Sequence, residues 1–296
     1  MRIRAFELQE PVPELREPHA LATLRPWVDV SNVGSMTLAS LESHLDALEL
    51  AKLARPGNFL DFTRYRPTMY LKEGIRELHV PNSTITYARP ERAHDFLFLH
   101  LLEPHMLAEV YVESVLQLLK SFGVKRYCLI GAMYDMVPYT RPLLVTGAAS
   151  NPALQDDLER ANVVSSDYEG STTIAYLVSQ RAPEMGIETL SLIVHLPQYL
   201  TMENDYRGEK RLLEVLSQLY GLPLADVDAE KASEQHDQVR RIAEQWIEQE
   251  PRYGAILSQL EAHYDSRVEQ GKAESRLSPE LEKLLQDLQR RFSEGS

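Results

Sequence analysis

The stretch 95–130 constrains the fold of this chain most, because strand, helix and strand signals follow one another in it without a break. Asp95–Leu101 and Val124–Ile130 are almost entirely apolar, which suits strands that are covered on both faces. Between them, apolar residues recur at helical spacing over Leu107–Phe122, and Gly123 stands where a helix would end. This order predicts a right-handed βαβ crossover between two parallel strands.

Strand and helix signals also alternate on either side of this unit. Before it, Ala20–Val28 predicts a strand, and apolar residues at helical spacing from Met36 to Leu53 predict a helix. After it come a short strand at Leu143–Val145 and a third apolar strand at Leu190–Val194. Further helices are expected at 153–160, 174–182 and around 212–219. The alternation predicts an α/β fold with a mainly parallel or mixed sheet.

Two segments predict additions to that sheet. Residues 3–8 alternate weakly between apolar and polar, and could form an edge strand or an arm. The segment 58–87 is rich in aromatic residues, Arg and Pro, with short strands at Thr68–Tyr70 and Ile75–Val80. These strands are antiparallel additions to the sheet or a flap. The aromatic and Arg side chains could make a subunit contact or cover a sheet edge.

The composition of the chain changes at Asp226. No strand-like run follows, and three helical patterns appear, the last of which begins at Ser278-Pro279. We therefore expect an α/β core domain with an N-terminal arm over 1–225 and a C-terminal helical extension over 226–296. The first two helices of the extension should pack on the core. The last helix could be a tail that docks on another subunit or on a client protein.

Charge and cysteine content limit the possible partners and location. The formal net charge of −13 argues against binding to a nucleic-acid backbone or to anionic lipid. The single cysteine, Cys128, lies inside an apolar strand, which fits a core side chain in a reducing compartment. No apolar run is long enough for a transmembrane helix, and the N-terminus does not read as a signal peptide. We therefore expect a cytoplasmic protein without nucleic-acid or membrane partners.

The turn Val137–Pro142 is the best candidate for a functional site. Its two prolines fix the backbone around Arg141, which follows the carboxyl end of a predicted strand, where open α/β sheets form clefts. The sheet should bring Glu169 to the same edge. Arg141 and Glu169 would then be an anion clamp and a polar contact in a ligand cleft, or a structural ion pair that joins two loops. Asp135 could join this cluster.

Other polar groups give weaker signals. The turn Asn32–Ser35 has one glycine and no dinucleotide or phosphate-binding pattern, which favours a tight strand-to-helix turn. His100, Glu103 and His105 lack the spacing that puts two histidines on one helix face, so no metal site is expected. His195 ends an apolar strand and is either catalytic or, more commonly, a hydrogen-bonded core histidine. No nucleophile elbow occurs, and no cofactor is predicted.

Four motifs in order resemble the proteasome-assembly-chaperone-like family of archaea and bacteria. They are Trp27–Gly34 (WVDVSNVG), Pro138–Pro142 (PYTRP) with Thr146-Gly147, Tyr168–Gly170 (YEG) and Pro197–Leu200 (PQYL). The resemblance covers about Leu21 to Pro223. It implies a three-layer α/β/α sandwich, like phosphorylase/hydrolase-like folds, and a ring-like homo-oligomer that is often trimeric.

The resemblance implies no established reaction. Members are sometimes labelled ATP-grasp-like, but this chain has no phosphate loop or metal-ligand set that would fit that label. Tyr139 and Gln198 stand where the family usually has His, and Ser171 and Thr173 stand where it has Pro and Gly. A proton-transfer or metal role of those histidines therefore does not carry over to this chain.

We therefore expect a non-enzymatic assembly or interaction protein that acts as a homo-oligomer, with a trimer favoured and a protein client. The alternative is a small-molecule-binding protein or enzyme that uses the Arg141/Glu169 cleft for an anionic or nucleoside-like ligand. The candidate ligand-binding residues of that cleft are Asp29, Asn32, Gly34, Tyr139, Thr140, Arg141, Tyr168, Glu169, Gly170 and Tyr199. No catalytic residue is assigned.

Overall fold

The computed structural model describes residues 1–91, 94–166, 168–224 and 228–270. Its strands are β1 (Arg2–Ile3), β2 (Phe6–Leu8), β3 (His19–Arg25), β4 (Leu48–Leu53), β5 (Thr68–Lys72), β6 (Ile75–His79), β7 (Thr84–Ala88), β8 (Phe96–Leu102), β9 (Arg126–Asp135), β10 (Val145–Ala149), β11 (Val164–Ser165) and β12 (Glu188–Pro197). Its α-helices are α1 (Val33–His44), α2 (Ala108–Ser121), α3 (Pro152–Arg160), α4 (Ile174–Arg181), α5 (Tyr206–Tyr220), α6 (Ala229–Gln249) and α7 (Arg252–Gln270).

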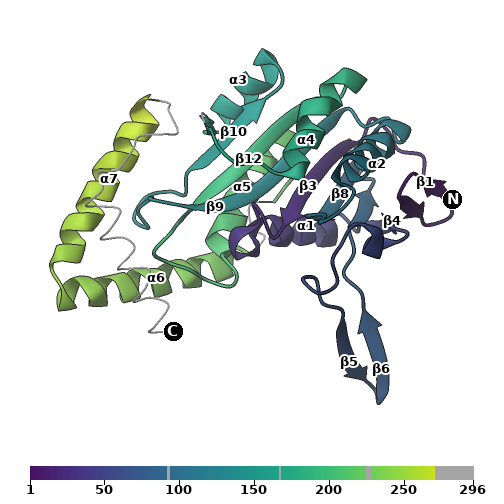
Figure 1. The fold of residues 1–296 in the computed structure, drawn as a ribbon. Coiled ribbons are helices and arrows are strands. Elements are labelled where there is room, and N and C mark those ends of the chain that lie inside the picture. The colour runs from purple at the N-terminus through teal and green to yellow at the C-terminus, as the bar shows by residue number, and fades with distance from the viewer. Residues whose placement is uncertain (92–93, 167, 225–227, 271–296) are drawn as a thin grey trace. The chain divides into compact units, whose positions relative to one another are not determined.

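Main-chain hydrogen bonds join ten of these strands into one mixed sheet (Figure 1). The strand order is β1-β2-β4-β7-β8-β3-β9-β12-β10-β11, and β5 and β6 form a separate hairpin. The predicted α/β class with a mixed sheet is confirmed. None of the helices in the described part of the chain is long and apolar enough to cross a membrane.

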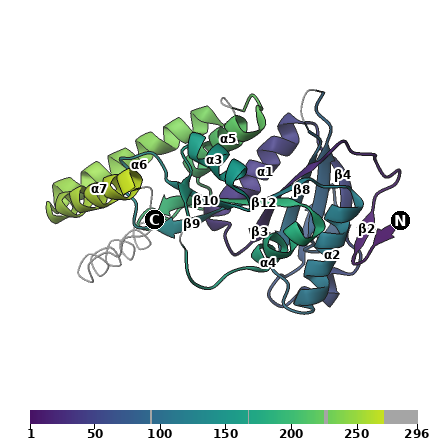
Figure 2. The same ribbon diagram turned by 90° about the horizontal axis from the view of Figure 1, so that it is seen from above.

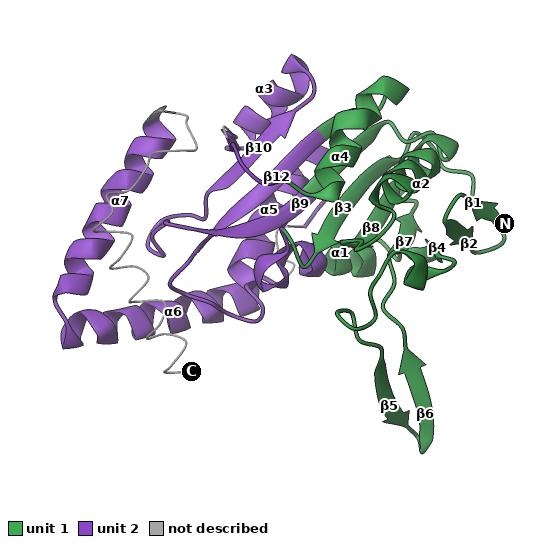
Figure 3. Ribbon diagram, in the orientation of Figure 1, with its two compact units in different colours: residues 1–27, 38–129, 172–189 green, residues 28–37, 130–171, 190–296 purple. Residues whose placement is uncertain are grey.

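The chain divides into two compact units, which we describe separately (Figure 3). Unit 1 comprises Met1–Trp27, Leu38–Leu129 and Thr172–Thr189; unit 2 comprises Val28–Thr37, Ile130–Ser171 and Leu190–Ser296. Each unit combines several separate pieces of the chain. They therefore differ from the core over 1–225 and the extension over 226–296 that the sequence predicts, and that boundary stays a prediction.

The βαβ crossover forms the centre of unit 1. Strand β3 pairs in parallel with β8 along its whole length and with the start of β9, so β8 and β9 are parallel, as predicted, with β3 between them. Gly123 follows α2 with φ of +67°, the left-handed conformation that a helix-ending glycine adopts. Figure 2 shows α2 and α4 on one face of these strands and α1 on the other. This arrangement explains why nearly all residues of β3 and β8 are buried.

The predicted helix up to Leu53 is wrong in its second half. Helix α1 ends at His44, and Leu48–Leu53 is strand β4, which pairs antiparallel with β2 and β7. Asp46, with φ of +50°, lies between the two elements. Leucines spaced three to five residues apart fit a helix. In the structure, Leu50 and Leu53 are instead buried side chains of an extended strand.

Strands β5 and β6 are present where the sequence predicts them, but they do not join the large sheet. They pair antiparallel with each other from Thr68↔His79 to Lys72↔Ile75, and all ten residues of the two strands are exposed. The expected addition to the sheet is therefore wrong. The hairpin instead corresponds to the flap, which was the alternative prediction for this segment.

Unit 2 contains the other end of the sheet. Strand β9 continues past Ile130, the last residue of the predicted strand, to Asp135, and β10 begins at Val145, later than the predicted Leu143. Strand β10 pairs antiparallel with β12 and in parallel with the short β11. Helix α3 packs on β10 and β11.

Three helices complete unit 2. Asp205 caps α5 by accepting a hydrogen bond from the Gly208 amide (2.9 Å), and Gly221 ends the helix with φ of +65°. Helix α6 packs on α5, and α7 packs on α6. The first two helices predicted beyond residue 226 are therefore confirmed, and the third lies outside the described residues.

Candidate functional site

The turn Val137–Pro142 leaves β9 and is fixed against helix α7. Val137 and Leu144 pack with Tyr264 in one small apolar cluster. The Tyr264 hydroxyl also donates a hydrogen bond to the Pro142 carbonyl (2.8 Å). The two prolines limit the turn's backbone freedom, and Tyr264 fixes the turn to α7. Arg141, between these contacts, therefore has a defined position relative to α7.

The Arg141 guanidinium binds two carboxylates of α7. Its Nε and Nη2 donate to the two oxygens of Asp265, both at 2.9 Å, and its Nη1 donates to Glu261 (3.2 Å). Thr140 donates to the same Glu261 oxygen (2.5 Å). The hydrogen bonds from Arg141 hold the pKa of Asp265 below its usual value. A bidentate Arg–carboxylate pair of this kind fixes geometry as well as charge.

The predicted pairing of Arg141 with Glu169 is therefore wrong. Among the described residues, Glu169 forms no ion pair, and its side chain is exposed. Tyr168 and Gly170 beside it are exposed too, and the Tyr168 hydroxyl closes the loop by donating to the Ser171 carbonyl (3.0 Å). Glu261 and Asp265 lie one helical turn apart on α7, so both carboxylates are on the helix face that Arg141 contacts. They take the place that the sequence assigned to Glu169.

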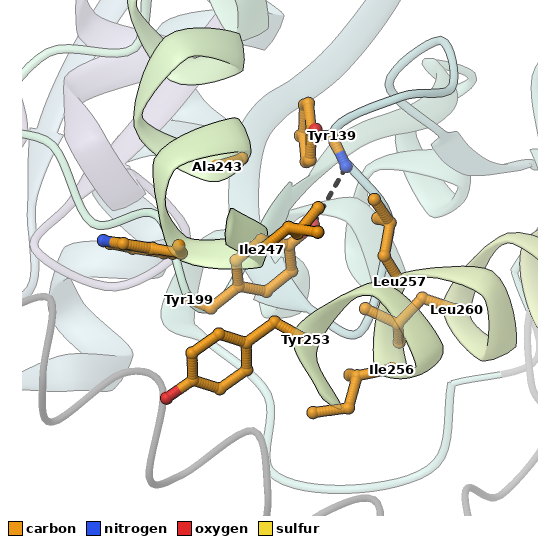
Figure 4. A pocket seen from close by; sticks show the side chains of 9 residues that line it. Tyr139, Tyr199, Ala243, Ile247, Tyr253, Ile256, Leu257 and Leu260 are labelled. Atoms are coloured by element: carbon orange, nitrogen blue, oxygen red, sulfur yellow. Dashed lines mark hydrogen bonds between the residues drawn. The ribbon is translucent and has the colours of Figure 1, made fainter. Parts of the chain in front are cut away.

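Tyr139 of the turn and Tyr199, both predicted site residues, lie together. The Tyr139 amide donates to the Tyr199 hydroxyl (2.9 Å), and both rings are buried. They line a narrow apolar pocket of about 30 Å³, partly open to solvent, with side chains of α6 and α7 (Figure 4). The other lining residues are Ala243, Trp246, Ile247, Tyr253, Ile256, Leu257 and Leu260. We call this pocket the α6–α7 groove.

A second group of predicted residues lies in the loop before α1 and in the first turn of that helix. Asp29 is buried and accepts from both the amide (3.0 Å) and the hydroxyl (2.5 Å) of Ser35. The Asn32 amide group donates to the Glu203 carbonyl and to Asn204, both at 3.0 Å, and Gly34 is buried. These partners belong to the first turn of α1 and to the segment before α5. The loop is therefore a hydrogen-bonded structural element, as the tight-turn interpretation predicts.

This loop has an unusual backbone. Val28, Ser31 and Asn32 all have φ between 52° and 57°, a region that a β-branched residue such as Val rarely adopts. The conformation brings the Val28 carbonyl to the Ala132 amide (2.8 Å), beside Gly131. A Cβ at Gly131 would lie 2.0 Å from that carbonyl oxygen. Glycine at position 131 therefore permits the loop to approach β9.

A buried polar network, only two residues of which were expected from the sequence, lies at the end of β9. Asp135 accepts hydrogen bonds from His195 Nδ1 (2.7 Å) and from Arg267 Nη1 of α7 (2.8 Å). His195 Nε2 lies 2.8 Å from the Thr146 hydroxyl. Burial alone would raise the pKa of Asp135, but the hydrogen bonds and charges of His195 and Arg267 outweigh it and lower that pKa. We call these four residues the Asp135 network.

Thr146, His195 and Asp135 are hydrogen-bonded in the order hydroxyl, histidine, carboxylate, as in a catalytic triad. Burial and the contact with Arg267 nevertheless favour a structural role. Thr146 and His195 are 4% and 5% exposed, so both side chains are buried in the core. Asp135 also binds Arg267. Its negative charge is therefore shared between the guanidinium and the histidine. His195 is thus the hydrogen-bonded core histidine of the two alternatives. The position of His195 at the end of an apolar strand and the position of Asp135 before the turn were the signals in the sequence for this network.

The two histidines of the segment His100–His105 contact other residues of the protein. His100 contacts Glu42 (3.0 Å), and His105 Nδ1 accepts from the Asp61 amide (3.2 Å). Within the described ranges, no group of three or more His, Cys, Asp or Glu residues could hold a metal ion.

Cys128 is completely buried, and burial raises the pKa of its thiol. Such a thiol is a core side chain.

Comparison with known proteins identifies the family. The model of the PAC2 family matches residues 23–247, about three quarters of the chain. The chain belongs to the PAC2 family. A search of curated proteins found no match.

Three solved structures illustrate the fold of this PAC2 protein. A PAC2 family protein from Streptomyces avermitilis has a TM-score of 0.70 at 24% identity, covering 77% of this chain and 96% of that one. A proteasome-assembly chaperone homologue from Mycobacterium tuberculosis scores 0.67 at 23% identity, with 75% and 94% covered. A Pyrococcus furiosus proteasome activator scores 0.64 at 16% identity, with 80% and 97% covered. At these identities the likeness shows the fold alone.

Proposed function

We propose that this PAC2 protein is a non-enzymatic assembly or interaction protein that acts as a homo-oligomer, with a trimer favoured, on a protein client. The observation that carries the proposal is family membership over residues 23–247. Structural relatives are named as a proteasome-assembly chaperone homologue and a proteasome activator. A multi-subunit particle of the proteasome type is the first client to test. A cytoplasmic location fits this role and the buried thiol of Cys128.

The geometry around Arg141 supports an interaction role over anion binding. A ligand clamp needs donors that are free to meet an anion, whereas Arg141 directs three of its N–H groups to Asp265 and Glu261. An incoming anion would have to displace two carboxylates. The contact therefore supports a structural role for Arg141, which is to hold α7 on the turn. The same helix contributes Arg267 to the Asp135 network.

The test combines client capture with a search for turnover. Purified tagged protein should retain defined client subunits, with proteasome subunits as the first probes, and should not convert members of a metabolite panel. Arg141→Lys keeps the charge but cannot bind Asp265 through a planar fork, and serves as the matched variant for Arg141→Ala. Failure to retain any probe, together with turnover that Arg141→Ala abolishes, would overturn the proposal.

The ligand-binding role of the ten predicted cleft residues stays a prediction with its own test. Thermal unfolding is measured with phosphate, nucleosides and nucleotides on wild type and Arg141→Ala. A ligand at a hundred times its dissociation constant adds about 2.7 kcal/mol to the free energy of unfolding. Stabilisation that depends on Arg141 would favour the ligand-binding alternative, and its absence with every compound would reject it.

A further inference from the structure

In the described part of the chain, the hairpin of β5 and β6 has two free edges (Figure 1). Its two-residue turn, Glu73-Gly74, has φ of +51° and +82°, positive at both positions as in the type I′ turn that suits the twist of a hairpin. All ten residues of the two strands are exposed. An isolated two-stranded hairpin is only marginally stable in water. A further strand at one of the edges would therefore stabilise it.

The free main-chain groups of β5 belong to Met69 and Leu71. Lys72 and Ile75 are paired on either side of the turn. The pair that closes a two-residue turn exchanges both main-chain hydrogen bonds, and such pairs alternate with non-hydrogen-bonded pairs along an antiparallel ladder. Every second residue of β5, counted back from Lys72, is therefore directed to β6. The N–H and C=O groups of Met69 and Leu71 are directed outward, where another strand can bind them.

The sequence of β5 is complementary to itself in antiparallel register. When two copies of β5 are aligned about Tyr70, each Met69 lies opposite the Leu71 of the other copy. These are the residues with free main-chain groups, so each such pair can exchange both of its hydrogen bonds. Tyr70 then lies opposite Tyr70 in a non-hydrogen-bonded pair, where side chains are closest, and an aromatic pair there stabilises a sheet. Thr68 lies opposite Lys72, so no like charges meet.

The outer edge of β6 lacks this complementarity. By the same alternation, its free main-chain groups belong to Arg76 and Leu78, so full-length pairing of two β6 strands is centred on Glu77. That register places Glu77 of one copy directly opposite Glu77 of the other. Like charges directly opposite each other destabilise a sheet. The hairpin therefore favours self-pairing at the edge of β5.

We propose that the hairpins of two copies pair through their β5 edges, in antiparallel register centred on Tyr70, and form one four-stranded sheet in the order β6-β5-β5-β6. The same surface is used by both copies, so the contact is isologous and joins copies in pairs. On one face of the sheet, Leu78, Met69 and the Leu71 of the second copy form a continuous apolar row.

This contact goes beyond the proposed function, because it is separate from the contacts that would form a trimer. The pairing edge has five residues on each side, whereas a stable interface uses roughly 20–30 residues on each side. We therefore expect weak association that requires a high protein concentration. The contact then doubles the mass of the assembly that the rest of the chain forms.

The first experiment follows the mass of the purified chain by sedimentation velocity, from low micromolar to submillimolar concentration. The mass should double over this range. Leu71→Pro removes an outward N–H that the hairpin itself does not use, and it should prevent the doubling. The matched control, Leu78→Pro, removes an outward N–H from β6 and should leave the doubling unchanged. A constant wild-type mass, whatever its value, or equal effects of the two variants would overturn this contact alone.

Substitutions at Tyr70 test the register. Tyr70→Lys and Tyr70→Glu should each weaken the association about tenfold, because like charges would lie opposite each other. An equimolar mixture of the two variants should recover it, since a lysine then lies opposite a glutamate. A mixture that associates no better than either variant alone would contradict the register.

A disulfide identifies the edge that pairs. Tyr70→Cys should join two copies on mild oxidation, because a non-hydrogen-bonded pair holds its Cα atoms about 4.5 Å apart, within the range of disulfides. The matched control is Glu77→Cys, which is paired with Tyr70 in the same hairpin but lies on β6 and should not cross-link. The native Cys128 is buried and does not compete. No cross-linked product from Tyr70→Cys, or equal cross-linking of both variants, would overturn the pairing of β5 edges.

Discussion

Removing the carboxylate of Asp135 should destabilise unit 2 strongly. Asp135→Asn keeps the size of the side chain but removes the negative charge that faces Arg267 and His195. Arg267 is 5% exposed, so its guanidinium would be left in the interior without its carboxylate partner. Asp135 itself is 21% exposed, which limits solvent screening of the pair.

The expected cost follows from that burial. Leaving one member of a buried ion pair without its partner costs about 3–5 kcal/mol, a large part of the roughly 5–15 kcal/mol that stabilises a typical protein. The same loss should lower the thermal midpoint by roughly 10 °C. Since Arg267 belongs to α7, amide hydrogen exchange of α7 should rise more than exchange of the strands in unit 1.

The assay is guanidinium unfolding followed by circular dichroism, with a double-mutant cycle. Arg267→Met fills the same space without charge, so Asp135→Asn/Arg267→Met should be more stable than the sum of the two single losses predicts. A coupling energy of about 1–3 kcal/mol would identify the buried pair as the cause. A loss below about 1 kcal/mol for Asp135→Asn, or strict additivity, would refute the reasoning.

Further predictions follow from individual contacts. The folded-state pKa of Asp135 is lowered, so its stabilisation is present above about pH 4 and is lost as pH falls through the folded value; the difference in unfolding free energy between wild type and Asp135→Asn should shrink below that pH. Gly131→Ala should cost about 1–3 kcal/mol in denaturant unfolding, because its Cβ would meet the Val28 carbonyl oxygen at 2.0 Å. Gly254→Ala, in helix α7 with its nearest neighbour at 3.5 Å, should instead gain about 0.5–1 kcal/mol, and a loss there would contradict the packing. Cys128 should react with a maleimide only after denaturation, as mass spectrometry of native and unfolded samples would show.

Local patterns in the sequence were sufficient for much of the fold. The βαβ unit, α2 with Gly123, and α5 with Gly221 are each specified by apolar periodicity and a helix-ending glycine within one segment. The same periodicity failed at Leu48–Leu53, where leucine spacing fits both a helix and a strand. Only pairing with β2 and β7, which are distant in sequence, decides that this segment is extended.

The candidate site was harder to predict because its partners are distant along the chain. Arg141 was singled out correctly as a residue held in a rigid turn, but its carboxylates lie more than a hundred residues later in α7. Glu261 and Asp265, four residues apart on one helix, are visible in the sequence only as an acidic helix face. Likewise, His195 and Asp135 were noticed separately, and nothing local indicates that Arg267 and Thr146 join them.

The mass of the purified protein tests the central claim most directly, namely that this PAC2 chain works through contacts between folded proteins. Native mass spectrometry at micromolar concentration should find one closed homo-oligomer, with three copies expected, and no small molecule retained with it. A protein that is monomeric at every concentration and carries a bound metabolite would contradict the account.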